Sequence, residues 1–276
     1  MTLIEVLKLS SDHLAKHGSD SARLDSEILL SHALGLRRLD LYLKFDRTLT
    51  EPELAACRSL VGRRAKGEPV AYLVGHKEFM GLDFEVTPAV LVPNPDTEVL
   101  VQRAVAIARE EARPMRVADV GTGSGCIAVA IAHYAPNTEM WASDISPEAL
   151  EVAARNVAAH HLEDRVHLSC GDLLDPLPGA FDLITANLPY LASTRWLPRE
   201  VVAQPAAALY ADNEGAGLVT RLFAEAPDKL NPGGRVLAEL DLSILESAAG
   251  AADVGFKLRR VHRDLGGHER VLEAWS

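Results

Sequence analysis

The sequence predicts an α/β protein with a seven-stranded, mostly parallel sheet, preceded by a small all-helical domain and a linking β-hairpin. After Pro95, short apolar runs alternate with helical stretches, which is typical of a parallel sheet covered on both faces. The first 66 residues show only the spacing of apolar residues that belongs to helices. Between these regions, apolar and polar residues alternate over residues 70–92 as they do in strands, which indicates a hairpin.

The composition is that of a folded protein of one large or two modest domains. The chain has 276 residues, of which 48% are hydrophobic and 24% are charged, and this balance excludes disorder for the bulk of the chain. No apolar run approaches the length that spans a membrane. The first residues lack the basic and apolar regions of a signal peptide. We therefore expect a cytoplasmic protein without membrane contacts.

The three cysteines, Cys57, Cys126 and Cys170, lie far apart in the sequence and form no C-x-x-C pair. This spacing argues against both a disulfide framework and a zinc ribbon. We expect the three thiols to be reduced and to lie in the core, and we expect no metal site.

Charge is distributed unevenly along the chain. The formal net charge is -11, which disfavours direct binding to nucleic acid because neutralising phosphates requires a basic surface. Residues 1–66 carry 11 Lys or Arg against 9 Asp or Glu, and the remainder carries 17 against 30. The net charges of +2 and -13 that follow from these counts suggest two domains with different roles.

Three helices are expected in the amino-terminal region. Leu3, Leu7 and Leu14 share one face of the first helix, and the second ends at Gly35. The third runs over residues 51–66.

The strand-like segment that follows is predicted to turn near Gly81. We therefore divide the chain into a helical domain, a hairpin linker and a sheet domain, which cover residues 1–69, 70–92 and 93–276.

Seven strands and five helices are expected in the sheet domain. The strands cover residues 116–120, 138–143, 166–169, 183–186, 235–240, 257–262 and 270–274. The helices cover residues 98–111, 124–134, 147–160, 215–230 and 245–252. Because the last two strands are close together in the sequence, we expect the sheet to end in an antiparallel pair.

A glycine-rich turn follows the first of these strands and opens a helix. It comprises Gly121, Thr122, Gly123 and Gly125, and Asp119 lies just before it in the strand. Glycine is needed where a ligand approaches the backbone closely or where a turn requires positive φ. The G-x-G-x-G spacing differs from the dinucleotide pattern, and no P-loop lysine follows, so nicotinamide and triphosphate ligands are disfavoured. A tight turn without a ligand is the alternative interpretation.

Two acidic residues follow the next two strands. Asp144 ends the second strand, where a carboxylate accepts hydrogen bonds from the two hydroxyls of a ribose. Asp172 follows the third strand, where it would accept from the exocyclic amine of adenine. Either residue alone is more often a helix cap or a solvated acid. At the same sheet edge as the glycine turn, however, they predict an adenosine site.

The glycine turn and the two acids together resemble the class I methyltransferases, which have a Rossmann-like fold. That resemblance implies the cofactor S-adenosylmethionine, with Asp119 and the Gly121 turn serving its methionine end. The cofactor-binding residues implied in this way are Asp119, Gly121, Thr122, Gly123, Gly125, Asp144, Asp172 and Asn187.

The sequence Asn187-Leu188-Pro189-Tyr190 follows the fourth strand and is similar to the Asn-(Pro/Leu)-Pro-Tyr motif of amino-methyltransferases. The resemblance implies that Asn187, Pro189 and Tyr190 are catalytic and that all four residues bind the substrate. The Asn187 side-chain oxygen and the Leu188 carbonyl would accept the two hydrogens of a planar amide, and Tyr190 would pack on it. Pro189 restricts Leu188 to extended conformations. A plain turn after the strand is the alternative interpretation.

Nearly the whole chain resembles the peptide chain release factor glutamine methyltransferases, the HemK or PrmC family. The matching segments include Arg63–Leu73, Val92–Glu98, Leu230–Gly234 and Asp264–Gly267. The resemblance implies methylation of the glutamine amide in the Gly-Gly-Gln motif of class I release factors, with docking by the amino-terminal domain.

Three departures from that family keep other functions open. Leu188 replaces the usual first proline of the motif, Asn94 stands where arginine is common, and residues 204–205 and 239–243 match poorly. Asn-Leu-Pro-Tyr also resembles the adenine dimethyltransferases of ribosomal RNA. The remaining alternatives are methylation of another protein glutamine or of a metabolite amine, and a catalytically silent relative.

Overall fold

The computed structural model describes residues 1–264 and 266–276. Leu265, which belongs to the Asp264–Gly267 match, lies outside the described residues. The chain forms two compact units, one made of Met1–His76 with Leu197–Gln204 and the other of Lys77–Trp196 with Pro205–Ser276. Within the described part of the chain, we find no helix with the length and apolar character needed to cross a membrane.

The first unit is helical. Its elements are α1 (Leu3–Lys16), α2 (Ala22–Leu34), α3 (Arg38–Leu43), α4 (Glu51–Ala65), α5 (Val70–Val74) and α9 (Arg199–Val202). The three predicted helices are confirmed, and α2 ends at Gly35 in the left-handed conformation that favours glycine. The predicted apolar face is also confirmed, because Leu3, Leu7 and Leu14 all lie in the core of this unit. Helix α3, which is only six residues long, was not predicted.

A short segment of the second half of the chain belongs to this helical unit. Helix α9 lies against Gly67, where an added Cβ would come within 2.7 Å of the Arg199 Cβ. The buried guanidinium of Arg64 pairs with Asp25 at 2.7 Å and also with Glu200 of α9.

The prediction of strand structure throughout residues 70–92 is partly wrong. Residues 70–74 form α5 rather than a strand, because Pro69 begins a helical turn and Gly75 ends it at a φ of +84°. The hairpin itself is confirmed, with strands β1 (His76–Phe79) and β2 (Leu82–Glu85). Met80 and Gly81 have φ values of +53° and +75°, as a two-residue hairpin turn requires.

The second unit contains the predicted sheet of seven strands. They are β3 (Met115–Val120), β4 (Thr138–Asp144), β5 (Val166–Cys170), β6 (Phe181–Ala186), β7 (Leu230–Glu239), β8 (Leu258–Arg263) and β9 (Glu269–Trp275). Their order is β5-β4-β3-β6-β7-β9-β8. The pairs among β3 to β7 are parallel, and β9 runs antiparallel to both β7 and β8. The antiparallel end of the sheet is therefore confirmed.

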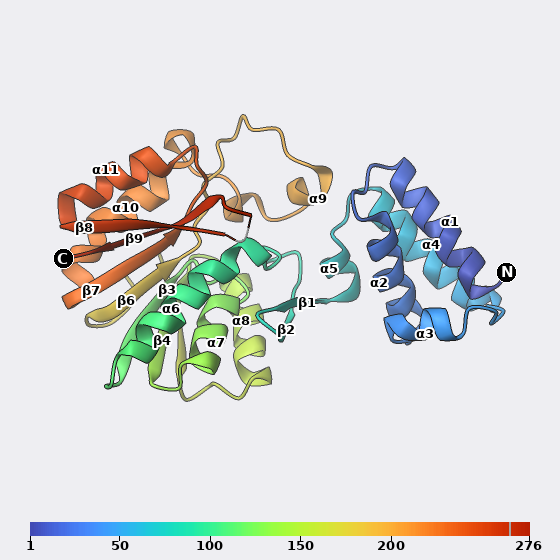
Figure 1. The fold of residues 1–276 in the computed structure, drawn as a ribbon, viewed down its shortest axis with the longest axis horizontal. Coiled ribbons are helices and arrows are strands. Elements are labelled where there is room, and N and C mark those ends of the chain that lie inside the picture. The colour runs from blue at the N-terminus through green and yellow to red at the C-terminus, as the bar shows by residue number, and fades with distance from the viewer. Residues whose placement is uncertain (265) are drawn as a thin grey trace. The chain divides into compact units, whose positions relative to one another are not determined.

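Helices cover both faces of this sheet (Figure 1). One face carries α6 (Glu98–Glu110), α7 (Cys126–Tyr134) and α8 (Pro147–Ala159), and the other carries α10 (Gly217–Glu225) and α11 (Leu245–Gly255). The 3-10 helices are η1 (Pro95–Thr97), η2 (Ala206–Ala208), η3 (Asn213–Gly215) and η4 (Ala226–Lys229). Pro227 lies in η4, which continues from α10 and replaces the end of the predicted 215–230 helix.

The expectation for the cysteines is only partly confirmed. All three thiols are free, and Cys57 and Cys126 are buried. Cys170 is exposed, because it is the last residue of β5 at an edge strand of the sheet.

The strand order reverses between β3 and β6. The chain runs outward from β3 to β4 and β5, and then returns to β6 on the other side of β3. Val120 pairs with Ala186 at the carboxyl ends of these two strands. Ligands of open α/β sheets bind in the crevice at such a reversal, so we expect the functional site at the residues that follow Val120 and Ala186.

Candidate active site

The glycine turn after β3 has the backbone conformation that its glycines predict. Gly121, Gly123 and Gly125 have φ values of +72°, +53° and +79°. The N–H groups of Gly121 and Thr122 both donate to the Ser143 carbonyl at 2.9 Å, which fixes the turn to the end of β4. An added Cβ at Gly123 would meet no atom within 4 Å, so the backbone there is open to a ligand.

Asp119 lies beneath this turn. Its side chain is fully buried and accepts hydrogen bonds from the hydroxyls of Thr122, at 2.7 Å, and Thr185, at 3.0 Å. Burial raises the pKa of Asp119 to about 6, because desolvation disfavours the carboxylate more than its hydrogen bonds favour it. Asp119 therefore connects the glycine turn to β6 at the point where the strand order reverses.

Asp144 lies at the same edge, at the end of β4. One carboxylate oxygen accepts from the Gly123 N–H at 2.8 Å and the other from the Ser146 N–H at 2.9 Å. The next residue, Ile145, is 68% exposed. Ile145 was not predicted as a site residue, although a large apolar side chain next to a predicted ribose-binding acid is a usable signal.

Asp172 follows β5, the neighbour of β4. Its carboxylate pairs with the guanidinium of Arg221 in α10 at 2.8 Å, and both side chains are about half exposed. Arg221 was not predicted, because a helix residue so distant in sequence from Asp172 carries no local signal of this contact.

The predicted amide-binding motif follows β6. The side-chain nitrogen of Asn187 donates to the Thr97 hydroxyl at 3.1 Å. Leu188 is buried against the glycine turn, where an added Cβ on Gly121 would come within 2.9 Å of its Cδ2 atom. Pro189 and Tyr190 are partly exposed, and burial raises the pKa of the Tyr190 phenol. The structure thus brings the motif and the glycine turn into contact.

Backbone contacts hold the segment after Tyr190 in place. The Leu191 N–H donates to the Leu209 carbonyl at 3.0 Å, and the Ala211 N–H donates to the Leu191 carbonyl at 3.1 Å. Gly215 packs so closely on this segment that an added Cβ would lie 2.2 Å from the Tyr190 carbonyl oxygen. These contacts were not predicted from the sequence.

Two further buried residues lie beside Asn187. Thr97, which precedes α6, is 2% exposed, and Glu239, the last residue of β7, is 3% exposed. Burial raises the pKa of Glu239 to about 7, and the Thr97 hydroxyl, which interacts with this carboxyl group, partly offsets the increase. Both residues were missed, although Glu239 is an acid at the carboxyl end of a predicted strand, as Asp144 is.

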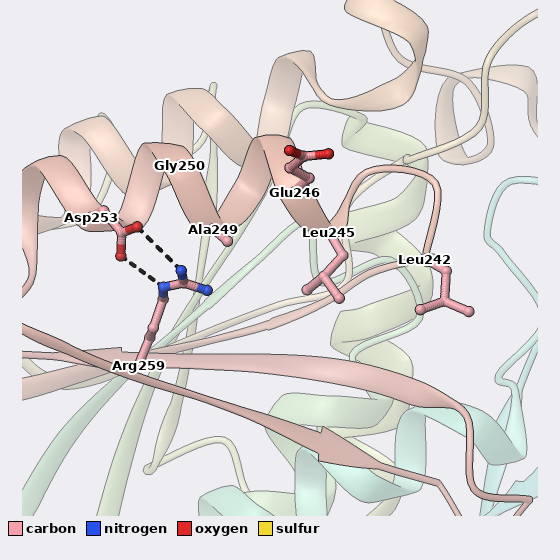
Figure 2. A pocket seen from close by; sticks show the side chains of 7 residues that line it. All are labelled: Leu242, Leu245, Glu246, Ala249, Gly250, Asp253 and Arg259. Atoms are coloured by element: carbon pink, nitrogen blue, oxygen red, sulfur yellow. Dashed lines mark hydrogen bonds and ion pairs between the residues drawn. The ribbon is translucent and has the colours of Figure 1, made fainter.

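A groove of about 430 Å³ lies elsewhere, between α11 and β8 (Figure 2). Its polar side chains include Asp253 and Arg259, which pair at 2.7 Å. None of the predicted site residues lines this groove. In the part of the chain that the structure describes, we also find no group of three or more His, Cys, Asp or Glu residues arranged to hold a metal ion.

Comparisons with known proteins give a consistent result. Residues 5–75 match the family model of the PrmC N-terminal domain, and residues 95–240 match that of the methyltransferase small domain. The chain is 43% identical to the release factor glutamine methyltransferase of Geobacter sulfurreducens, over 98% of this chain and 95% of that protein. It is 41% identical to the protein of the same name from Rhodopirellula baltica, over 98% and 95% of the two chains.

A solved structure has the same fold. The methyltransferase from Pyrococcus furiosus aligns with 79% of this chain and 98% of its own, with a TM-score of 0.54 and 22% identity. The sheet and its helices therefore form a class I methyltransferase fold.

Proposed function

The chain belongs to the release factor glutamine methyltransferase family, and from that premise we propose its reaction. It transfers a methyl group from S-adenosylmethionine to the side-chain amide nitrogen of the glutamine in the Gly-Gly-Gln motif of class I peptide chain release factors. The observation that carries this proposal is the contact between Leu188 of the amide-binding motif and Gly121 of the glycine turn. Methyl donor and amide acceptor would then meet at the reversal of strand order.

The residues at the ends of β3 and β4 fit S-adenosylmethionine. The open space at Gly123 leaves room for a ligand against the backbone. Each oxygen of Asp144 accepts one backbone hydrogen bond and keeps a further lone pair for a ribose hydroxyl. The exposed Ile145 offers apolar surface to a purine ring. When bound, S-adenosylmethionine supplies a methyl carbon made electrophilic by a cationic sulfur.

The remaining cofactor residues have supporting roles in this proposal. Asp172 accepts a hydrogen bond from the adenine amine. It does so either alongside its ion pair with Arg221 or in place of that pair. Asp119 fixes the hydroxyl of Thr122, and with it the turn that receives the methionine end. Gly125 allows α7 to begin close to Ala153, because an added Cβ at Gly125 would lie 3.2 Å from the Ala153 Cβ.

The amide-binding motif positions a weak nucleophile. An amide nitrogen attacks poorly because its lone pair is delocalised into the carbonyl group, so orientation must supply much of the rate. The Asn187 side-chain oxygen and the Leu188 carbonyl accept the two amide hydrogens, and Tyr190 packs on the planar group. As the nitrogen–carbon bond forms, the bond between the methyl carbon and sulfur breaks and leaves its electron pair on sulfur. The nitrogen loses one proton, for which water is a sufficient acceptor. Pro189 keeps the Leu188 carbonyl in an extended orientation.

We also propose that residues 1–69 dock the release factor and that residues 93–276 catalyse methyl transfer. Residues 70–92 link these two domains. The net charge of +2 for residues 1–66 against -13 for the remainder supports separate roles. Because this substrate is a protein of the translation machinery, the proposal places the enzyme in the cytoplasm and needs no direct contact with nucleic acid.

The proposal is tested by methyl transfer from labelled S-adenosylmethionine. Three acceptors are compared: an intact class I release factor, the same factor with the Gly-Gly-Gln glutamine changed to alanine, and ribosomal RNA. Label on the intact factor alone is the expected result. In Asn187→Ala, we expect transfer to fall at least about 100-fold while the dissociation constant for S-adenosylmethionine changes much less.

Methylation of adenine in RNA is the second candidate, and Leu188 is the observation that favours it. Label on RNA but not on the factor would replace the proposed reaction with this one. Label on neither acceptor, with S-adenosylmethionine still bound, would indicate another amide or amine substrate or a catalytically silent relative.

A further inference from the structure

We propose that Glu239 and Thr97 form a hydrogen-bond relay that orients the side-chain amide of Asn187, with Glu239 acting as a positioning residue for methyl transfer. This inference rests on the proposed function, because it takes Asn187 as the group that binds the acceptor amide. The three residues come from different elements: Thr97 precedes α6, Asn187 follows β6, and Glu239 ends β7.

The chemistry of the donors sets the direction of the relay. The side-chain nitrogen of Asn187 can only donate, so the Thr97 hydroxyl accepts from it, over 3.1 Å. The single hydrogen of Thr97 is then free to point toward the Glu239 carboxyl group, with which the hydroxyl interacts. An ionised carboxylate can only accept, so it excludes the reversed arrangement. The Asn187 amide cannot flip without losing its bond to Thr97, and its oxygen remains available for the substrate.

Local structure holds Thr97 at the centre of this relay. The Asn94 side-chain oxygen accepts from the Asp96 N–H at 3.1 Å, and the Thr97 N–H donates to the Asn94 carbonyl at 3.0 Å. These bonds form the turn that places the Thr97 hydroxyl in the core. Asn94, which departs from the common arginine of the family, thus has a structural role in this chain.

Burial of Glu239 destabilises the fold, so stability alone does not account for its position. Its Oε2 atom is buried and has no hydrogen-bond partner among the described residues. The nearby cation, Arg270, donates to Asp264 at 2.9 Å and pairs with Asp96 at 2.9 Å. A buried acid with an unsatisfied oxygen lowers the free energy of unfolding, and such groups are concentrated at functional sites. This supports a role for Glu239 in the reaction.

The relay is tested with four variants. Thr97→Val removes the hydroxyl at nearly constant volume, Thr97→Ser retains it, and Glu239→Gln removes the obligate acceptor. Thr138→Val is the matched control, because Thr138 is similarly buried, with 3% exposed against 2% for Thr97, and its hydroxyl donates to the Ala135 carbonyl at the opposite end of the sheet. For each, kcat and KM are measured with the release factor. Hydrogen exchange of the Asn187 side-chain amide is measured by NMR without substrate, with Asn187→Asp to assign the signal.

We expect Thr97→Val to lower kcat about 10- to 100-fold, because misplacing a group that orients the substrate has effects of that size. KM for S-adenosylmethionine should stay within about twofold of its original value, since the cofactor residues are intact. Thr97→Ser should restore most of kcat, and Thr138→Val should leave kcat unchanged. Glu239→Gln should lower kcat, and both Thr97→Val and Glu239→Gln should accelerate exchange of the Asn187 amide.

The two measurements separate the two proposals. If the unmodified enzyme fails to methylate the factor, the proposed function is wrong, and amide exchange still decides on the relay. Unchanged exchange of the Asn187 amide in both Thr97→Val and Glu239→Gln would overturn the relay. The same conclusion would follow if Thr97→Val and Thr138→Val lowered kcat equally.

Discussion

Two buried glutamates of the same sheet have opposite pKa shifts. Glu239 ends β7, and Glu273 lies in the adjacent strand β9, opposite Leu237. Their side chains are similarly inaccessible, with exposed fractions of 3% and 0%. Burial raises the pKa of Glu239 to about 7, whereas the pKa of Glu273 is lowered to about 2.

Hydrogen-bond partners account for the difference. Glu273 accepts from the Arg103 guanidinium at 2.9 and 3.0 Å and from Arg235 at 2.6 Å, and His262 lies at 2.7 Å. These donors outweigh the cost of burying the charge. Glu239 interacts with the Thr97 hydroxyl, and its buried Oε2 atom has no hydrogen-bond partner among the described residues. Burial alone therefore does not distinguish the two acids, whereas the incomplete pairing of Glu239 does, and it makes Glu239 the candidate for a role in the reaction.

The largest effect on stability is expected for Glu273→Ala. It leaves Arg103 and Arg235 without their buried partner, so the free energy of unfolding should fall by about 3–5 kcal/mol, measured by urea unfolding. At temperatures where the variant is folded, kcat should be unchanged. The control is Asp253→Ala, which breaks the exposed Asp253–Arg259 pair and should cost less than about 1 kcal/mol. Similar losses in both variants would refute a special role for Glu273.

Acid should destabilise the protein through the same residue. The pKa of Glu273 is about 2 in the folded state against 4.5 for the free side chain, so the folded state favours the charged form. Its contribution is present above pH 4.5 and is lost as the pH falls toward 2. Glu273→Gln should flatten the pH dependence of the free energy of unfolding in this window, by about 2–3 kcal/mol. An unchanged acid limb would contradict the assignment.

Glu239→Gln should raise the free energy of unfolding at alkaline pH, which is opposite to the effect of Glu273→Ala. The folded-state pKa of about 7 lies above the free value of 4.5, so stability falls as the pH rises between these values. At pH ~8 the glutamine variant should be more stable by about 1–2 kcal/mol while its kcat is lower. The charged groups that interact with Glu239 are Arg270 and Asp96, and it interacts with the Tyr190 phenol. Lower stability together with unchanged kcat would show that Glu239 serves the fold alone.

Features with local signals could be predicted from the sequence, whereas contacts between residues far apart in the chain could not. The seven strands, the glycine turn and the positions of Asp144 and Asn187 carry local signals: apolar runs, glycines and polar residues at strand ends. The Thr97–Asn187 contact joins residues 90 positions apart, and no local pattern reports such a bond. Helix α5 was missed because five residues between a proline and a glycine are too short for periodicity to separate helix from strand.

The smallest effect is expected for Arg270→Gln. The Arg270 cation lowers the pKa of Glu239, and Asp96 raises it. If the relay requires ionised Glu239, kcat should rise with pH through about 7 in the unmodified enzyme. Arg270→Gln removes the cation and leaves Asp96 unpaired, and both changes favour protonated Glu239. The midpoint of the kcat profile should therefore move upward by about half a pH unit.

Arg103→Gln is the control for this measurement, because Arg103 pairs with Glu273 instead. It should lower stability and leave the midpoint in place. If the midpoint moved downward in Arg270→Gln, or moved equally in both variants, the ionisation of Glu239 would not determine the pH dependence of kcat. The ionisation that limits kcat would then belong to another group, and the relay would have to operate with Glu239 in either protonation state.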